Sequence, residues 1–364
     1  MQETQPYDRV RQPQARPVRR VGPPTQPRPR NWGRRIKLGL LLIVAALVIG
    51  GVLLFLKAAA FNDAVSTESA LSMRLFGPFA GGERVNILLL GYSDESRDGA
   101  FLSDSMNVLS IDRETDTTSL IGIPRDIWVE GIPEVPQNMK INEALRIGYY
   151  ADGIENGAEL AAKAVTQVTG LPIDGWVTLD FQGFEAMVDA IGGVTIENPT
   201  AFSYTWHEGN YLAGIWEDQF AAGTQQMTGQ KALDYARIRY ASIPAESSDF
   251  ARSVRQQRVL QAIRAKVSGW RTLPDGLAIS DAMQGHLRTN LSVFDLGMLA
   301  GRLDVDRRIE LTEDVILRAS TNSIGQYIFV VIGQATSSDY SPLHAYIEEQ
   351  LSAPLPTPEP SVSP

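Results

Sequence analysis

Three short apolar runs between residues 85 and 123 restrict the fold of this chain more than any other stretch does. The first run, Val85–Leu90, is almost entirely aliphatic, which is typical of a strand buried on both faces. The other two, Ser105–Ile111 and Thr117–Ile123, flank the short polar turn Glu114-Thr115-Asp116, and this pattern predicts an antiparallel hairpin. We therefore expect the three strands to be neighbours in one sheet.

Charged residues gather in the loops that follow these runs. Asp94, Arg97 and Asp104 lie between the first two runs, and Arg125 follows the third. If the strands are neighbours, their loops can bring several carboxylates and an arginine together. Clustered carboxylates beside guanidinium groups suit a divalent cation together with a phosphate. The sequence thus predicts a site for a metal-bound phosphate group.

Helical and extended patterns both occur beyond this stretch, which indicates an α/β fold. Helices are expected over Glu155–Thr169, Phe181–Ile191, Gly229–Tyr235, Asp249–Val267, Ser292–Leu303 and Pro342–Leu351. Further strands are expected over Trp176–Asp180, Val194–Ile196 and Tyr327–Ile332. The aromatic segment Thr200–Gly223 lacks a period, so we expect an irregular surface loop or flap there.

The amino-terminal part of the chain predicts one membrane-spanning helix. Leu38–Leu56 carries no charge and is about as long as a helix that crosses a bilayer. Arg34, Arg35 and Lys37 precede it, so the positive-inside rule places the amino terminus in the cytoplasm and the folded part outside. A cleaved signal peptide is the alternative, but this apolar run is longer than a typical signal core.

The composition argues against several kinds of chemistry. There is no cysteine, which excludes disulfides, thiolate metal sites and a cysteine nucleophile. The three histidines, His207, His286 and His344, are far apart, which argues against a zinc site or a serine–histidine triad. The net charge is −9 although arginines are concentrated before Leu38, so the folded part is acidic. An acidic, exported domain does not suit nucleic-acid binding.

Seven short motifs then follow one another along the chain: NILLLGYSD, LSDSM, IPRD, KINEA, VDAIGGV, GQKALDYARIR and DFARSVRQQRVL. In this order they resemble the LytR–CpsA–Psr family of membrane-anchored cell-envelope phosphotransferases, over roughly Val85–Ser268. The resemblance implies an α/β fold with a mixed central sheet packed by helices and preceded by one transmembrane helix. It also implies transfer of a glycopolymer from a polyprenyl-pyrophosphate carrier to a peptidoglycan hydroxyl, with Mg²⁺ as cofactor and release of polyprenyl phosphate.

Two groups of residues carry the roles that the resemblance implies. Those expected at the catalytic centre are Asp94, Asp104, Arg125, Arg237 and Arg239, of which the two aspartates would hold Mg²⁺. Those expected to bind the pyrophosphate around it are Arg97, Lys140, Arg255 and Gln257. A guanidinium binds phosphate through two hydrogen bonds and stays protonated, which explains why arginines recur in both groups.

The chain departs from the family pattern at Leu102, where the family usually has an arginine, and Arg97 is the nearest substitute. Two further functions therefore stay open. The same site could hydrolyse a lipid pyrophosphate with water as nucleophile, or the domain could bind polyprenyl phosphate as a non-catalytic regulatory module. The stripe of Arg252, Arg255 and Arg258 on the Asp249–Val267 helix also has two interpretations, a ligand site or an exposed helix face.

The expected layout of the whole chain follows from these assignments. A disordered basic cytoplasmic arm (1–37) precedes the membrane anchor (38–60) and a linker (61–82). The catalytic domain (83–268) is followed by a carboxy-terminal extension (269–351) packed on or beside it, and by a disordered Pro/Ser tail (352–364).

Overall fold

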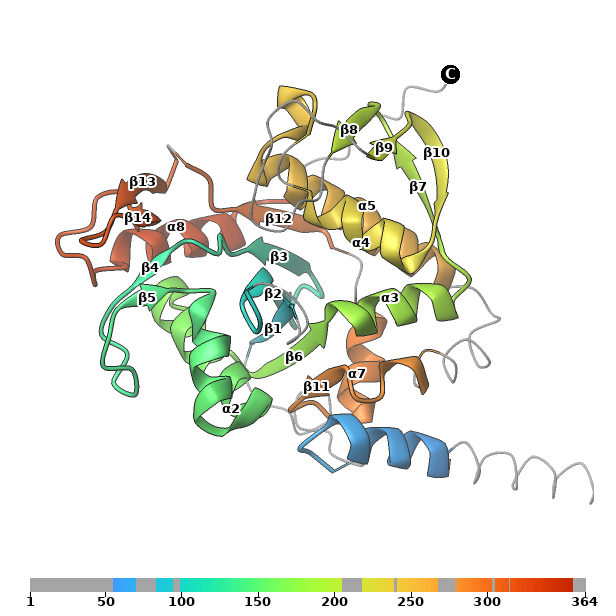
Figure 1. The fold of residues 1–364 in the computed structure, drawn as a ribbon. Helices are drawn as coiled ribbons and strands as arrows, with labels where there is room; N and C mark the ends of the chain where they lie inside the picture. The colour runs from blue at the N-terminus through green and yellow to red at the C-terminus, as the bar shows by residue number, and fades with distance from the viewer. Residues whose placement is uncertain are drawn as a thin grey trace, which may run out of the picture. The chain divides into compact units, whose positions relative to one another are not determined.

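The computed structural model describes residues 55–69, 83–93, 99–204, 218–238, 241–267, 279, 281–302, 305–313 and 315–355 (Figure 1). Of the expected membrane anchor, only residues 55–60 belong to these ranges. Among the helices in the described ranges, none is both long and apolar enough to cross a bilayer. The membrane anchor therefore stays a prediction.

A six-stranded mixed sheet forms the centre of the fold, in the order β11-β6-β1-β2-β3-β12 (Figure 1). Its strands are β1 (Arg84–Tyr92), β2 (Ser103–Asp112), β3 (Thr118–Gly122), β6 (Gly175–Asp180), β11 (Leu287–Thr289) and β12 (Arg307–Glu310). β1 pairs antiparallel with β2 and parallel with β6, while β2 pairs antiparallel with β3. The predicted hairpin and the mixed central sheet are thus confirmed.

The side chains of β1 alternate between two cores, because both faces of the sheet are covered. Leu88 and Leu90 face a core shared with α2 (Glu143–Thr169) and α8 (Ser341–Ser352). Val85 and Ile87 face a second core shared with α7 (Val293–Ala300). Since each of these four side chains is at most 2% exposed, the prediction of a strand buried on both faces is confirmed.

α2 consists of two helical halves joined at a sharp kink, and begins earlier than the predicted helix. Asp152 and Gly153 have non-helical dihedrals, and the φ of 82° at Gly153 is one that glycine adopts readily. The halves meet where Gly148 faces Gly157, since a Cβ on Gly148 would lie 2.6 Å from the Cα of Gly157. The absence of side chains at these two positions allows the close packing.

A second group of elements, between residues 181 and 267, has a core of its own. It comprises α3 (Phe181–Ala190), β7 (Val194–Asn198), β8 (Phe202–Tyr204), β9 (Asp218–Phe220), β10 (Gly223–Met227), α4 (Gly229–Arg237), the 3-10 turn η1 (Pro244–Glu246) and α5 (Asp249–Val267). The interpretation of Thr200–Gly223 as an irregular surface loop is wrong for its described residues. Phe202, Tyr204 and Phe220 lie on paired strands and are buried against one another.

The residues after Ser268 complete the central sheet. β11 and β12 are its two edge strands, pairing with β6 and β3 respectively. β13 (Leu317–Thr321) and β14 (Tyr327–Val331) form a hairpin after β12, and β4 (Trp128–Val129) pairs with β5 (Met139–Lys140). The sheet therefore runs across the boundary that the sequence suggested at residue 268, and the supposed extension is part of the same domain.

The expected linker is described as far as residue 69, and this part is folded onto the domain. Residues 55–65 are helical, and Asn62 and Val65 are buried. The Asn62 side chain accepts a hydrogen bond from the backbone N–H of Val293 at 2.9 Å, and Ser66 Oγ donates to the carbonyl of Leu291 at 2.6 Å. These contacts attach the segment to the region between β11 and α7.

Candidate active site

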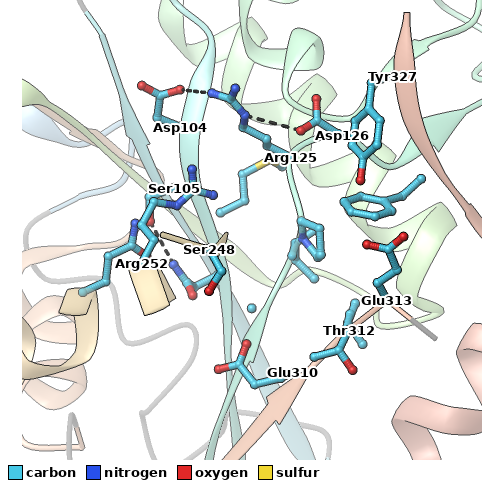
Figure 2. Close-up of a pocket in the computed structure, with 18 residues that line it drawn as sticks. Asp104, Ser105, Arg125, Asp126, Ser248, Arg252, Glu310, Thr312, Glu313 and Tyr327 are labelled. Atoms are coloured by element: carbon cyan, nitrogen blue, oxygen red, sulfur yellow. Dashed lines mark hydrogen bonds and ion pairs between the residues drawn. The ribbon is translucent and has the colours of Figure 1, made fainter. Parts of the chain in front are cut away.

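Asp104 lies between two arginines that are distant from it in the sequence. Arg125 Nη1 donates a hydrogen bond to Asp104 Oδ1 at 2.9 Å, as Figure 2 shows, and Arg237 Nη2 lies 3.6 Å from Oδ2. Between 20% and 28% of each of these three side chains remains exposed. Arg125 and Arg237 thus bring two guanidinium groups, which carry hydrogen-bond donors only, to a single carboxylate. The structure thus brings these predicted catalytic residues together.

Arg125 reaches this position because Pro124-Arg125-Asp126 directly follows β3. Asp126 is 6% exposed, and its two oxygens hold two cations: Oδ1 accepts from Lys140 Nζ at 2.7 Å, and Oδ2 lies 3.5 Å from Arg125 Nε. Lys140 comes from β5 and is a predicted pyrophosphate ligand. Its described contact is with Asp126, so it lies one carboxylate away from Arg125. A buried carboxylate between two cations fixes the orientation of both side chains.

Arg237 is the last residue of α4, and its guanidinium lies over an aromatic ring. The guanidinium carbon is 4.1 Å from the centre of the Phe181 ring. Phe181 begins α3 directly after β6, so the ring has a fixed position at the end of a central strand. An aromatic face attracts a guanidinium without using its N–H groups. Phe181 therefore orients Arg237 through the face of its guanidinium.

Asp104, Arg125 and Asp126 border a cavity of about 350 Å³ on the β2–β3 side of the sheet, and Arg237 reaches it through its contact with Asp104. Its lining residues are Asp104, Ser105, Met106, Asn107, Gly122, Ile123, Pro124, Arg125, Asp126, Ser248, Arg252, Gln256, Glu310, Leu311, Thr312, Glu313, Tyr327 and Phe329. Figure 2 shows that they converge from β2, the residues after β3, the start of α5 and the residues after β12. A volume of this size is typical of a small-molecule site.

Arg252 and Gln256 also line the cavity, although the sequence pattern indicated Arg252 only as part of the arginine stripe and indicated no role for Gln256. They are four residues apart on α5, so both lie on the helix face that borders the cavity. The signal that could have identified them is this i, i+4 spacing within DFARSVRQQRVL. The predicted ligands from this segment, Arg255 and Gln257, are the residues directly before and after Gln256, so they do not share its face of the helix.

Arg255 is completely buried, which argues against the predicted direct contact with a phosphate. Its guanidinium donates to Glu246 Oε2 at 2.6 Å and to the backbone carbonyls of Tyr235, Ile238 and Glu246. Burial lowers the pKa of Arg255, although Glu246 raises it in part. The interpretation of the arginine stripe as a uniformly exposed face is wrong at this position as well. Gln257 does not line the cavity either, and it supports Glu310 by a hydrogen bond.

Three of the predicted site residues, Asp94, Arg97 and Arg239, lie outside the described residues. Their assigned roles therefore stay predictions. The described neighbours of Asp94 are the last residues of β1, which pair with β2 close to Asp104 through the register Gly91↔Ser105 and Tyr92↔Ser103.

Asp104 also suits a role in holding Mg²⁺. This ion binds through one or two carboxylates, keeps several waters and shares phosphate oxygens, so it does not need a complete set of protein ligands. Within the described ranges no three His, Asp or Glu side chains form a ready metal site. Asp104 is a quarter exposed and borders the cavity, which provides one carboxylate of the required kind. The residues present fit a Mg²⁺ shared with a bound phosphate.

The fold and the site together define a mixed α/β protein with an arginine-bordered cavity that suits an anion. The model of the LytR_cpsA_psr family matches residues 54–337, and the chain belongs to this family. The matched region extends beyond Val85–Ser268 at both ends, in agreement with the sheet that the later residues complete.

Relatives and solved structures agree with this assignment. The polyisoprenyl-teichoic acid–peptidoglycan teichoic acid transferase TagU of Oceanobacillus iheyensis is 28% identical over 320 residues, which cover 86% of this chain and 93% of the relative. TagU of Bacillus mycoides is 30% identical over 217 residues, which cover 59% of this chain and 64% of the relative. The fold matches the crystal structure of B. subtilis TagU with a TM-score of 0.50 at 23% identity, covering 76% of this chain and 100% of that one. It also matches a Streptococcus agalactiae protein, gbs0355, with a TM-score of 0.55 at 24% identity, covering 75% and 90%.

Proposed function

We propose that this chain is a membrane-anchored phosphotransferase that works on the outer side of the cell membrane. It transfers a glycopolymer from a polyprenyl-pyrophosphate carrier to a hydroxyl of peptidoglycan and releases polyprenyl phosphate. The transferases among its relatives support this reaction type. The charge-free run Leu38–Leu56, preceded by basic residues, supports a single anchor with the amino terminus in the cytoplasm.

The observation that carries the proposal is the contact of Asp104, which lines the cavity, with both Arg125 and Arg237. A pyrophosphate repels an approaching hydroxyl until its negative charge is neutralised. Two guanidinium groups in fixed positions neutralise this charge and keep their own protons throughout. Because polyprenyl phosphate is already a stable leaving anion, positioning and charge neutralisation account for the chemistry that the protein must supply.

The remaining residues have supporting roles in this proposal. Arg252 brings a third guanidinium to the cavity, from α5, and so compensates for Leu102, where the family usually has an arginine. Asp126 and Lys140 fix the orientation of Arg125. Asp104, together with Asp94, would hold Mg²⁺, which when bound supplies positive charge next to the phosphate oxygens.

The substitution Arg125→Ala tests the proposal most directly. Transfer of a polyprenyl-pyrophosphate-linked glycan should fall by at least about 100-fold, because one of the charges that stabilises the transition state is lost. The melting temperature should change little, since Arg125 is partly exposed and its ion pairs are not essential to the core. Arg302→Ala is the matched control, because Arg302 pairs with the exposed Asp116 away from the cavity.

Activity of the Arg125→Ala protein close to that of the Arg302→Ala control would reject the assignment. The assay is run with and without a glycan acceptor. Release of polyprenyl phosphate that does not depend on an acceptor would identify a hydrolase that uses the same site. Binding of the donor without any turnover would identify a regulatory module.

A further inference from the structure

The cavity has two chemically different ends. Arg125 and Arg252 border one end, while Glu310, Thr312 and Glu313 border the other (Figure 2). Every residue of this second, acidic end, including Tyr327 and Phe329, comes from β12 and the residues that follow it. The proposed chemistry of the pyrophosphate uses only the arginine end, so the acidic end has no role in it.

Gly122 forms an open floor between the two ends. It is the last residue of β3, and its neighbours across the sheet are Asn107 on β2 and Glu310 on β12. A Cβ on Gly122 would lie 3.3 Å from Glu310 Oε2 and 3.9 Å from Asn107 Oδ1. The sheet surface is therefore bare at this point, with a polar side chain on each side. The side chains of Asn107 and Glu310 can therefore form hydrogen bonds with a flat, hydroxylated ring that lies on Gly122.

Glu310 is held in place at this floor. It lies on the same strand as Arg308, and Gln257 of α5 forms a hydrogen bond with its carboxyl group. Burial raises the pKa of Glu310, while Arg308 and Gln257 lower it in part. Gln257 thus supports a residue of the acidic end. The carboxyl group has a fixed position from which it can accept hydrogen bonds from a ligand.

The charge of this end decides which ligand it suits. Among the described residues that line the cavity, Glu310 and Glu313 have no arginine beside them, whereas the carboxylates at the other end are paired with Arg125. The acidic end therefore disfavours both the pyrophosphate and an anionic polymer. Carboxylates accept hydrogen bonds from sugar hydroxyls, and Tyr327, which is 48% exposed, offers a ring against which the apolar face of a sugar can pack. We infer that the acidic end binds an uncharged sugar ring of the glycan acceptor, next to the arginines that bind the donor.

This inference rests on the proposed function, because it assigns the acceptor to the free half of the same cavity. The donor also contains sugars, so the experiment must distinguish the two sources. Gly122→Val places a β-branched side chain, which suits a strand, on this surface, and because its Cβ would lie 3.3 Å from Glu310 Oε2 it also shifts the carboxyl group of Glu310. Glu310→Gln removes the charge and keeps the shape. Gly297→Ala, where an added Cβ has open space, and Glu114→Gln, on an exposed turn, are the matched controls.

The first measurement is binding of an uncharged β-1,4-linked N-acetylglucosamine tetramer to the full-length protein in detergent, followed by calorimetry. The wild-type protein and both controls should bind it, and Gly122→Val should weaken binding by about tenfold, which corresponds to about 1.4 kcal/mol. Glu310→Gln should weaken it less. Absence of binding to the wild-type protein, or equal binding to Gly122→Val, would overturn the inference.

The second measurement is the KM for acceptor and for donor in the transfer assay. Each variant should raise the KM for the acceptor by the same factor as its loss of binding, about tenfold for Gly122→Val and less for Glu310→Gln, and leave the KM for the donor unchanged. A rise in the donor KM alone would assign the site to a donor sugar and overturn the inference. If the wild-type protein transfers nothing but binds the tetramer through Gly122 and Glu310, the proposed function fails while the sugar site stands.

Discussion

Two arginine–carboxylate clusters of this protein have the same chemistry and opposite surroundings. At the cavity, Arg125 and Asp104 form an ion pair with 28% and 25% of their side chains exposed. Between α4, η1 and α5, Arg255 and Glu246 form an ion pair with 0% and 10% exposed. The first pair keeps N–H groups available for a ligand. The second uses its N–H groups on Glu246 and on backbone carbonyls.

The buried cluster fixes the position of the exposed one. The carbonyls that Arg255 binds belong to Tyr235 and Ile238, on either side of Arg237. The end of α4 is thereby fixed from inside the fold, while the Arg237 side chain extends towards Asp104 on the other side. Arg255 is thus a positioning residue, and Arg237 is the residue that contacts the ligand in the proposed mechanism.

The largest effect on stability is expected from Arg255→Ala. Removing the arginine leaves the carboxylate of Glu246 and three backbone carbonyls buried without their donor, which costs about 3–5 kcal/mol. The free energy of unfolding, measured by urea titration, should fall by this amount, whereas Arg302→Ala should change it by less than about 1 kcal/mol. If Arg255→Ala lowers the free energy of unfolding as little as Arg302→Ala does, the distinction between the two clusters is wrong.

A smaller effect is expected from Phe181→Leu, which removes the ring beneath Arg237. A cation–π contact contributes about 0.5–2 kcal/mol, so the KM for the donor should rise by about two- to thirtyfold. The free energy of unfolding should fall much less in Phe181→Leu than in Arg255→Ala. Phe294→Leu, on a partly exposed position of α7, is the control. A donor KM equal to that of the control would show that the ring does not orient Arg237.

The smallest effect is the pH dependence that Glu310 confers on stability. Burial raises the pKa of Glu310, so the folded protein binds its proton more tightly than the unfolded chain does. This contribution is fully present below the ordinary glutamate pKa of about 4.3 and is lost as the pH rises through the folded value. The melting temperature of Glu310→Gln minus that of the wild type should therefore increase as the pH rises from 4 to 8. Glu114→Gln should show a flat difference, and a flat profile for Glu310→Gln would contradict the effect of burial.

The sequence was sufficient where a local pattern decides the structure. The aliphatic run of β1 and the polar turn between β2 and β3 determine the centre of the sheet without help from distant residues. The motif order also selected Asp104, Arg125 and Arg237 correctly as residues that come together. Their exact contacts depend on the sheet register, which places the start of β2 next to the end of β3.

The sequence was insufficient where tertiary contacts choose between similar positions. Arg252 and Arg255 are three residues apart on a helix with a weak apolar pattern, so nothing local shows which one is buried. The ion pair with Glu246 accounts for the buried position of Arg255. The short strands β8, β9 and β11 have three residues each, too few for a period to be visible. Their assignment depends on the strands with which they pair.

The place of β12 in the sheet has a consequence for how the protein is made. β12 pairs with β3 and provides a wall of the cavity, yet it follows β3 by about half of the length of the chain. At a synthesis rate of about 5–20 residues per second, roughly 10–40 s pass between the appearance of the two strands. During this time β3 exposes an unpaired edge, which invites pairing with other chains. Correct folding of this protein thus requires that the edge of β3 is protected from other chains until β12 has been synthesised and pairs with it.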